Sequence, residues 1–86
     1  MGDVKFEVIK ELGVLSESSK GWTKEVNIIS WNDGVPVYDI RTWSPGREKA
    51  GKGVTLNDFE MLKLLEIMGE YDVKSAIYGQ ATEDNR

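Results

Sequence analysis

The sequence of 86 residues contains no cysteine and no histidine. Without cysteine the chain can form neither disulfides nor thiolate zinc sites, and it has no thiol nucleophile. Without histidine it lacks imidazole metal ligands and the commonest general base of enzymes. The carboxylates are plentiful, but no pattern pairs two of them at a predictable site. We therefore predict a protein that is not an enzyme and that needs no metal or cofactor.

Long apolar runs are also absent. No segment approaches the 18 apolar residues of a membrane-spanning helix. No apolar segment follows a basic start, as it would in a signal peptide. We expect a cytoplasmic protein without membrane partners. A chain of this length forms one domain with a marginal core, and, with disulfides and metals excluded, self-association is the remaining way to enlarge that core.

Basic residues are fewer than acidic ones, 11 against 15, which gives a net charge of −4. Taken alone, this charge argues against a phosphate-rich partner. The charge is unevenly spread, however, and binding depends on the local field rather than on the sum. The segment 41–52 has a local charge of +3, from Arg41, Arg47, Lys49 and Lys52 against Glu48. This basic segment is a candidate anion-binding surface.

Alternating apolar residues and turn signals predict four strands followed by a helix. The expected strands cover residues 4–15, 22–31, 35–43 and 54–56. A polar connection separates the first two, and a Gly-rich basic loop over 44–53 precedes the fourth. Strands that follow one another and then give way to a helix predict an α+β domain with an antiparallel sheet.

The first strand has a break near Ile9, and a helical interpretation of 4–12 competes with it, because Val4, Val8 and Leu12 are spaced by four. Gly13 and the β-branched residues favour the strand. Asn32-Asp33-Gly34 predicts a tight hairpin, because Asp-Gly tolerates the positive φ that such a turn requires.

The helix is predicted to run from about Asp58 to Met68 and to stop near Gly69. Asn57 and Glu60 have the spacing of a capping box. Apolar side chains occupy more than one side of this helix, whereas its own sheet can cover only one. The second side is a candidate dimer surface, which we assign to Phe59, Leu62, Leu65 and Met68.

The C-terminal residues continue this pattern less clearly. Residues 70–78 either extend the helix or form a short second helix, and residues 79–86 are polar. We expect a single domain over residues 1–78 and a flexible polar tail over 79–86.

The third strand carries the main candidate for binding. Period-two geometry places Asp39, Arg41 and Trp43 on one face. A face of Arg and Trp is not expected to be the main core side, and an Arg beside an exposed Trp can hold a phosphate while the ring stacks on a base. The alternative is a surface pair of Asp39 and Arg41 beside a partly buried Trp. For Trp22 and Trp31 the alternative to a binding role is burial in the core.

Gly51-Lys52-Gly53 is a weaker candidate. Glycines let backbone N–H groups approach a phosphate closely, and Lys52 adds positive charge. The segment is not a P-loop, because Gly53 stands where Ser or Thr must follow the lysine. The alternative is a flexible hairpin loop.

These residues resemble a known family. Val37-Tyr-Asp-Ile-Arg-Thr-Trp43, a basic loop, Gly51-Lys-Gly-Val-Thr-Leu56 and an amphipathic helix are similar to the positive-cofactor-four transcriptional coactivator domain, and to its short bacterial branch in particular. The resemblance covers about Phe6 to Met68. It implies an intertwined homodimer, in which two curved four-stranded antiparallel sheets offer grooves for single-stranded nucleic acid and the C-terminal helices pack together.

The resemblance also implies site residues. Arg41 matches a backbone-contacting arginine, and Lys52 and Gly53 match the Lys-Gly pair before the helix. Trp43 falls in the family's aromatic stretch, although Ser44 replaces a second aromatic, and Trp31 takes the place of an aromatic at the end of the second strand. Further candidates for nucleic-acid binding are Lys24, Lys20, Trp22, Arg47 and Lys49.

The sequence therefore predicts a single-stranded DNA-binding protein, with RNA as an alternative ligand, that tolerates many sequences. Its expected roles are transcription regulation or the protection of exposed single strands, at the nucleoid and in contact with the transcription machinery. The rival hypothesis is a dimeric protein-interaction adaptor that binds no nucleic acid, which the acidic composition favours.

Overall fold

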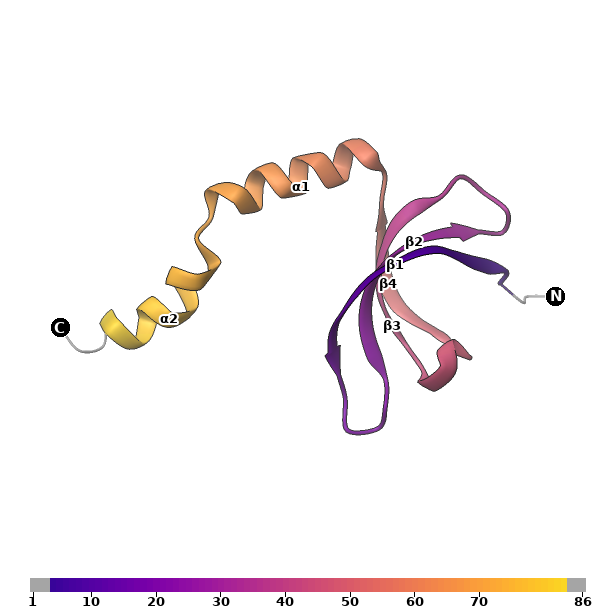
Figure 1. Cartoon of the computed structure of the whole chain (residues 1–86), viewed down its shortest axis with the longest axis horizontal. Coiled ribbons are helices and arrows are strands. Elements are labelled where there is room, and N and C mark those ends of the chain that lie inside the picture. Colours follow the sequence, from indigo (N-terminus) through magenta and orange to yellow (C-terminus); the bar gives the residue numbers. More distant parts are fainter. Residues whose placement is uncertain (1–3, 84–86) are drawn as a thin grey trace.

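A computed structural model describes residues 4–83 of the chain. Four strands form one sheet in the order β1-β2-β3-β4, and every neighbouring pair is antiparallel. The elements are β1 (Phe6–Glu17), β2 (Thr23–Trp31), β3 (Val37–Trp43), a 3-10 turn (Pro45–Arg47), β4 (Ala50–Leu56), α1 (Asp58–Glu70) and α2 (Val73–Glu83). Figure 1 shows the sheet at one end of the molecule and the helices at the other. The predicted α+β class with an antiparallel sheet is confirmed.

β1 is a bent strand, as the sequence predicted. Its pairing with β2 shifts register between Val8 and Lys10, where the break was expected, and at two further places along the strand. Each shift adds a residue to one strand only, which bends the strand and increases its twist. The helical alternative for residues 4–12 is wrong.

The hairpin between β2 and β3 forms at the predicted residues, but its geometry differs from the expectation. Positive φ values fall on Asn32 (52°) and Asp33 (61°) rather than on Gly34. Gly34 is required for a different reason: its N–H donates to the Trp31 carbonyl at 2.8 Å, and a Cβ there would lie only 2.9 Å from the same oxygen. β3 then begins at Val37, two residues later than predicted.

The sheet curls strongly, and this curl determines the rest of the architecture. The nine residues of β2 would span about 30 Å in a flat sheet. Trp43 lies opposite Thr23 at the start of β2, and Trp31 is its last residue. Nevertheless the rings of Trp31 and Trp43 stack with centroids 6.0 Å apart and planes at 2°. Opposite ends of the sheet therefore meet across one face, which we call the concave face.

β4 begins earlier than predicted. The Gly-rich segment was expected to be a loop up to Gly53, but the strand already starts at Ala50. The remaining connection contains a 3-10 turn over Pro45–Arg47, where no helical turn was expected. That turn is irregular, with positive φ at Gly46 (71°) and at Arg47 (57°). The expectation failed because the bends of the sheet accommodate glycines inside a strand.

α1 begins with the predicted capping box. The Asn57 side chain accepts the N–H of Glu60 at 2.8 Å, and the Glu60 carboxylate accepts the N–H of Asn57 at 2.9 Å. The helix ends at Glu70, one residue from the predicted stop near Gly69, and the N–H of Tyr71 donates to the Met68 carbonyl.

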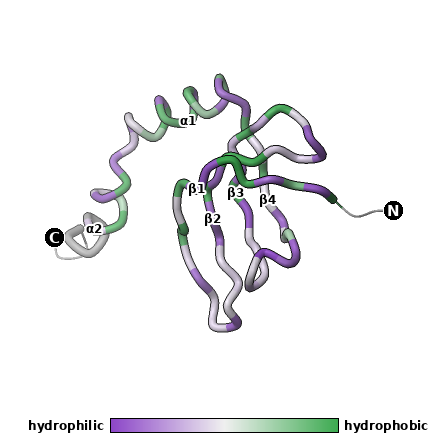
Figure 2. The backbone as a smooth tube through the Cα atoms, turned by 45° about the vertical axis from the view of Figure 1, so that its right-hand side comes forward, coloured by the Kyte–Doolittle hydropathy of each residue, from purple (hydrophilic) through white to green (hydrophobic). Residues whose placement is uncertain are grey.

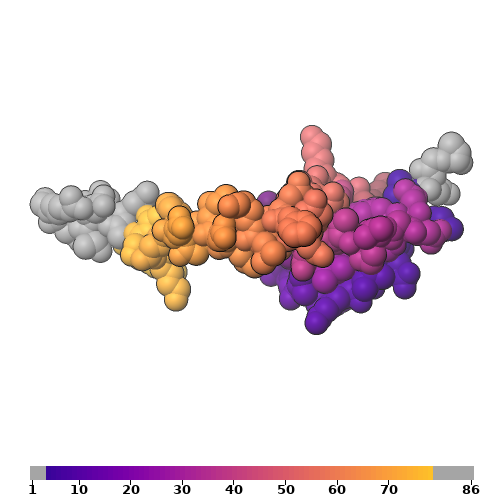
Figure 3. Space-filling model, turned by 90° about the horizontal axis from the view of Figure 1, so that it is seen from above, coloured from indigo at the N-terminus to yellow at the C-terminus, as the bar shows by residue number. Residues whose placement is uncertain are grey.

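α1 projects away from the sheet instead of packing along it (Figures 1 and 3). Only Met61 and Leu64 of this fully described helix are half-buried, and none of its residues is buried. The chain as a whole is extended: its radius of gyration is 16.4 Å, whereas about 12 Å is expected for a compact domain of this length. The apolar side chains assigned to a dimer surface are exposed, Phe59 at 81 % and Leu62 at 61 %.

α2 is a separate second helix, one of the two alternatives that the sequence left open. It follows Asp72, whose carboxylate accepts the N–H and the hydroxyl of Ser75 at 2.9 and 2.8 Å. These hydrogen bonds hold the pKa of Asp72 below its ordinary value. α2 extends to Glu83, so it includes much of the segment that was expected to be a tail, and residues 84–86 lie outside the described residues.

Candidate nucleic-acid interface

The concave face is lined by alternate residues of β2 and β3. Glu25 and Asn27 of β2 lie opposite Arg41 and Asp39 of β3, and Trp43 follows on the same face. The sequence correctly placed Asp39, Arg41 and Trp43 together. It was wrong that this face is not the core side, because the curl encloses it and leaves Asp39 and Trp43 0 % exposed.

Three aromatic rings cluster on the concave face. Phe6 lies with its ring centroid 5.7 Å from Trp31 and 4.9 Å from Trp43, and both pairs are tilted. Tilted and offset rings are the arrangements that aromatic pairs prefer. Trp43 is completely enclosed, and its Nε1 has no hydrogen-bond partner among the residues that the structure describes. The predicted stacking of a base on Trp43 therefore needs correction: its ring is a core element with no surface to offer.

Trp31 and Arg41 are held together by Asp39. The Arg41 Nε donates to both carboxylate oxygens of Asp39, at 2.8 and 2.9 Å, and Nη2 donates to Oδ2 at 2.8 Å. The indole Nε1 of Trp31 donates to Oδ2 of the same carboxylate at 3.2 Å. The guanidinium carbon of Arg41 lies 4.6 Å from the centroid of the Trp31 ring, a cation–π contact.

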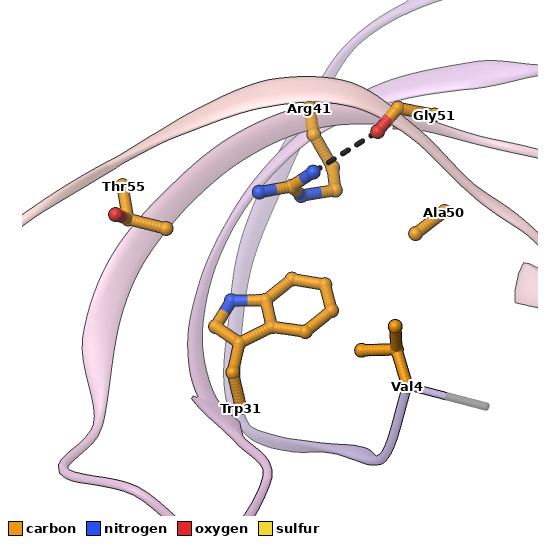
Figure 4. Close-up of a pocket in the computed structure, with 6 residues that line it drawn as sticks. All are labelled: Val4, Trp31, Arg41, Ala50, Gly51 and Thr55. Atoms are coloured by element: carbon orange, nitrogen blue, oxygen red, sulfur yellow. Dashed lines mark hydrogen bonds between the residues drawn. The ribbon is translucent and has the colours of Figure 1, made fainter. Parts of the chain in front are cut away.

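A hollow of about 370 Å³ opens beside this cluster, and we call it the Trp31 hollow (Figure 4). Its lining residues are Val4, Trp31, Arg41, Ala50, Gly51 and Thr55. Figure 4 shows the guanidinium group above the indole ring and donating to the Gly51 carbonyl, at 2.9 Å. An adjoining hollow shares Trp31 and adds Phe6, Glu48 and Lys49. The site is thus an open surface with an aromatic wall and a basic residue at its edge.

Arg47, a weaker candidate for nucleic-acid contact, is bound to carboxylates. Its Nη2 lies 2.8 Å from Oε1 of Glu25, and its Nη1 lies 3.2 Å from Oε2 of Glu11. Burial alone would raise the pKa of Glu25, but hydrogen bonds from Thr23, Asn27 and Arg47, with the charge of Arg47, outweigh it and hold that pKa below its ordinary value. Arg47 therefore ties the turn after β3 to the sheet.

Gly51-Lys52-Gly53 is part of β4 and not a loop that could wrap a phosphate. Gly53 lies opposite Arg41, where an added Cβ would collide with the Arg41 side chain. A Cβ at Gly51 would collide with the Thr42 hydroxyl. Close approach of β4 to β3 gives both glycines a packing reason, and the predicted contact of Gly53 with a phosphate stays a prediction.

The other candidates do not all gather on the concave face. Lys24 pairs with Thr42 and points to the opposite, convex face, because side chains alternate along a strand. Trp22 is half-buried and lies against Gly51, and Lys20 is in the turn before it. Lys49 borders the hollow next to Trp31. Within residues 4–83, Lys20, Lys24, Lys49 and Lys52 are exposed and form no ion pair.

Sequence reasoning missed several residues of this site. Asp39 was seen only as a surface partner of Arg41, and Phe6 and Thr55 were not considered. The signal available for Phe6 was its place at the start of an alternating strand, but only the curl brings it to Trp43. The acidic residues do not form a metal site, since the described part of the chain has no cluster of three His, Cys, Asp or Glu side chains. No helix within residues 4–83 is long and apolar enough to cross a membrane.

A curled antiparallel sheet with an aromatic and cationic hollow, followed by a helix, defines a small α+β domain that offers a ligand an open surface rather than an enclosed active site. Residues 18–67 match the family described as Transcriptional Coactivator p15 (PC4). The chain belongs to this family, which is associated with single-stranded DNA binding and transcriptional coactivation and is not enzymatic. An uncharacterized protein of Treponema pallidum (strain Nichols) is 46 % identical over 66 residues, which cover 77 % of this chain and 78 % of that protein.

Proposed function

We propose that the protein is a homodimer that binds single-stranded DNA with little sequence preference, with RNA as a second ligand. The observation that carries this proposal is the Trp31 hollow, where an indole ring and a guanidinium group border one open surface, with the exposed Lys49 at the adjoining hollow. Aromatic rings beside basic side chains suit unpaired strands, because every base has a face that can stack. In a duplex the bases are stacked on one another, so their faces are not available to an aromatic side chain.

The ligand would stack a base on Trp31 and place its phosphates near lysines. Each base stacked on an aromatic ring contributes about 1–3 kcal/mol. Lys49 is exposed and borders the adjoining hollow, which also contains the Trp31 ring. The excess of acidic residues over 57–86 lies mostly on the projecting helices and therefore away from the concave face.

The proposal includes a second copy of the chain as partner. α1 exposes Phe59, Leu62, Leu65 and Met68, and the chain is too extended to cover them itself. Burying such side chains between two copies supplies the core that a chain of this size lacks. Within the cell the dimer would act at the nucleoid, where transcription exposes single strands.

Titration of a fluorescein-labelled oligo-dT of about 20 nucleotides tests the proposed function. We expect a rise in anisotropy with quenching of tryptophan fluorescence, weaker binding at higher salt and poor competition by duplex DNA. A control oligonucleotide annealed to its complement separates stacking from simple charge attraction. Absence of binding at low salt would contradict the proposal and favour the rival hypothesis of a protein-interaction adaptor, which the exposed apolar face of α1 supports.

A further inference from the structure

Both arginines within the described residues are already bound to carboxylates. Arg47 lies between Glu25 and Glu11. Arg41 is paired with Asp39 at 2.8 Å, and its side chain is only 15 % exposed. The resemblance of the chain to its family predicts that Arg41 contacts the nucleic-acid backbone. Its ion pair with Asp39 limits the N–H donors and the net charge that are available to a phosphate.

The geometry leaves Arg41 little to offer. An arginine has five N–H donors. In Arg41 the Nε donor and one Nη2 donor bind Asp39, and one Nη1 donor binds the Gly51 carbonyl. A phosphate at the remaining donors would meet an arginine whose charge is already balanced by the Asp39 carboxylate on the other edge of the same guanidinium group. Repulsion by the anion then offsets part of the attraction by the cation.

The same carboxylate fixes the aromatic wall. Asp39 is fully buried, and it receives the indole N–H of Trp31 at 3.2 Å while it holds Arg41 at 4.6 Å from the ring centroid. These contacts set the orientation of the indole plane before any ligand arrives. A preformed stacking surface lowers the cost of ordering on binding.

From these contacts we infer that Asp39 is a positioning residue, and that the Asp39–Arg41 pair acts in nucleic-acid binding as a neutral support of Trp31 and not as a phosphate-neutralising charge. This inference rests on the proposed function. It has a measurable consequence, because only charges that phosphates neutralise release counterions. The salt dependence of binding must then come from lysines, of which Lys49 borders the site.

The test compares Arg41→Gln with Lys49→Gln, two variants that remove one positive charge each. For single strands, log K falls with log[salt] with a slope of about −0.7 per neutralised phosphate. We expect Arg41→Gln to weaken oligo-dT binding about tenfold or more, because it removes the support of Trp31 and leaves the Asp39 carboxylate unpaired, and we expect the neutral double variant Asp39→Asn with Arg41→Gln to leave this slope unchanged. Lys49→Gln should reduce the slope by about 0.7 with a smaller loss of affinity at high salt.

Asp39→Asn changes the salt dependence of binding, which the loss of a purely structural contact would leave unchanged. It leaves the Arg41 charge without its partner, so we expect the slope to become steeper by about 0.7 even as affinity at high salt falls. Near-ultraviolet circular dichroism reports the changed environment of Trp31. Should either single variant fail to fold, the double variant Asp39→Asn with Arg41→Gln keeps the site neutral and should bind with the slope of the wild type.

The outcomes are separable. A slope that falls in the double variant Asp39→Asn with Arg41→Gln as much as in Lys49→Gln would show that Arg41 neutralises a phosphate and would overturn the inference. Unchanged affinity in both Arg41→Gln and Asp39→Asn would also overturn it, because no positioning role would remain. Failure of the wild-type protein to bind oligo-dT contradicts the proposed function itself, and it is seen before any variant is compared.

Discussion

At the scale of single residues, Trp43 shows how burial and function can be confused in a sequence. Its ring contacts Phe6 and Trp31 and is fully enclosed. Trp31, in contrast, is half-buried and borders both hollows. Two tryptophans in one aromatic stack therefore have different tasks, one in the core and one at the surface.

Replacing Trp43 by Ala should destabilise the whole domain. Truncation of a buried tryptophan costs about 3–5 kcal/mol, which is a large part of the 5–15 kcal/mol typical of a folded domain. Chemical denaturation monitored by circular dichroism measures this loss. The matched control is Trp31→Ala, which should cost less stability and lose more binding to oligo-dT. A Trp43→Ala protein of normal stability that no longer binds would restore the stacking role to Trp43.

Glu25 makes the stability of the protein depend on pH. Its pKa lies below the ordinary value of 4.5, so the fold favours the ionised carboxylate. A depressed pKa gives stability that is complete above the unfolded value and is lost as the pH falls through the folded one. Glu25→Gln should therefore lower stability by about 1–3 kcal/mol at pH 7 and flatten the decline of stability between about pH 5 and pH 3.

The control for this experiment is built into the same network. Glu11 also pairs with Arg47 but is 67 % exposed, against 8 % for the side chain of Glu25. Exposed ion pairs contribute little, typically under about 1 kcal/mol, so Glu11→Gln should leave the pH profile nearly unchanged. Thermal melts from pH 3 to 7 make the comparison. Parallel profiles for the wild type and Glu25→Gln would contradict the assignment.

At the scale of elements, α1 combines strong local signals with missing tertiary contacts. Its capping box forms as predicted, because capping depends on residues that are neighbours in the chain. Most of its apolar side chains, by contrast, remain exposed within the described chain. Figure 2 shows hydrophobic and hydrophilic stretches succeeding one another along this projecting helix. A helix of this kind gains its stability from packing, which points to a partner.

Replacing both Leu62 and Leu65 by Gln should dissociate the proposed dimer. Burial of a leucine contributes about 1.5–3 kcal/mol, and a symmetric dimer would lose four of them, so its dissociation constant should rise at least about a hundredfold. Analytical ultracentrifugation measures this constant. The control is Lys63→Gln with Glu66→Gln, which removes an exposed ion pair on the same helix. A wild-type protein that sediments as a monomer would contradict the dimer.

At the scale of the whole molecule, the sequence predicts what is local and misses what the curl creates. The four strands, the hairpin at Asn32 and the start of α1 are encoded by neighbouring residues, and all were predicted. The enclosure of Trp43 was not, because it requires strand ends far apart in a flat sheet to meet. The role of Asp39 was missed for the same reason, since its contact with Trp31 crosses the bend between neighbouring strands.

The family resemblance closed only part of this gap. It indicated the curved sheet and the importance of Arg41. It did not predict the ion pair of Arg41 with Asp39 or the packing of Gly53 against Arg41, because both depend on side-chain geometry. The match to the family also ends at residue 67, so α2 lies outside it. Residue types can therefore be carried over from relatives more safely than the charges that they present.

The projecting α1 has a further consequence, which concerns protein concentration. If a second copy covers its apolar faces, folding and association become one equilibrium, and the melting temperature rises with the amount of protein present. Dilution would then weaken the fold itself, and a single strand spanning both copies would counteract that dilution by holding them together. The fold would be most stable where the protein is abundant or bound to a single strand, and least stable where it is dilute and unbound.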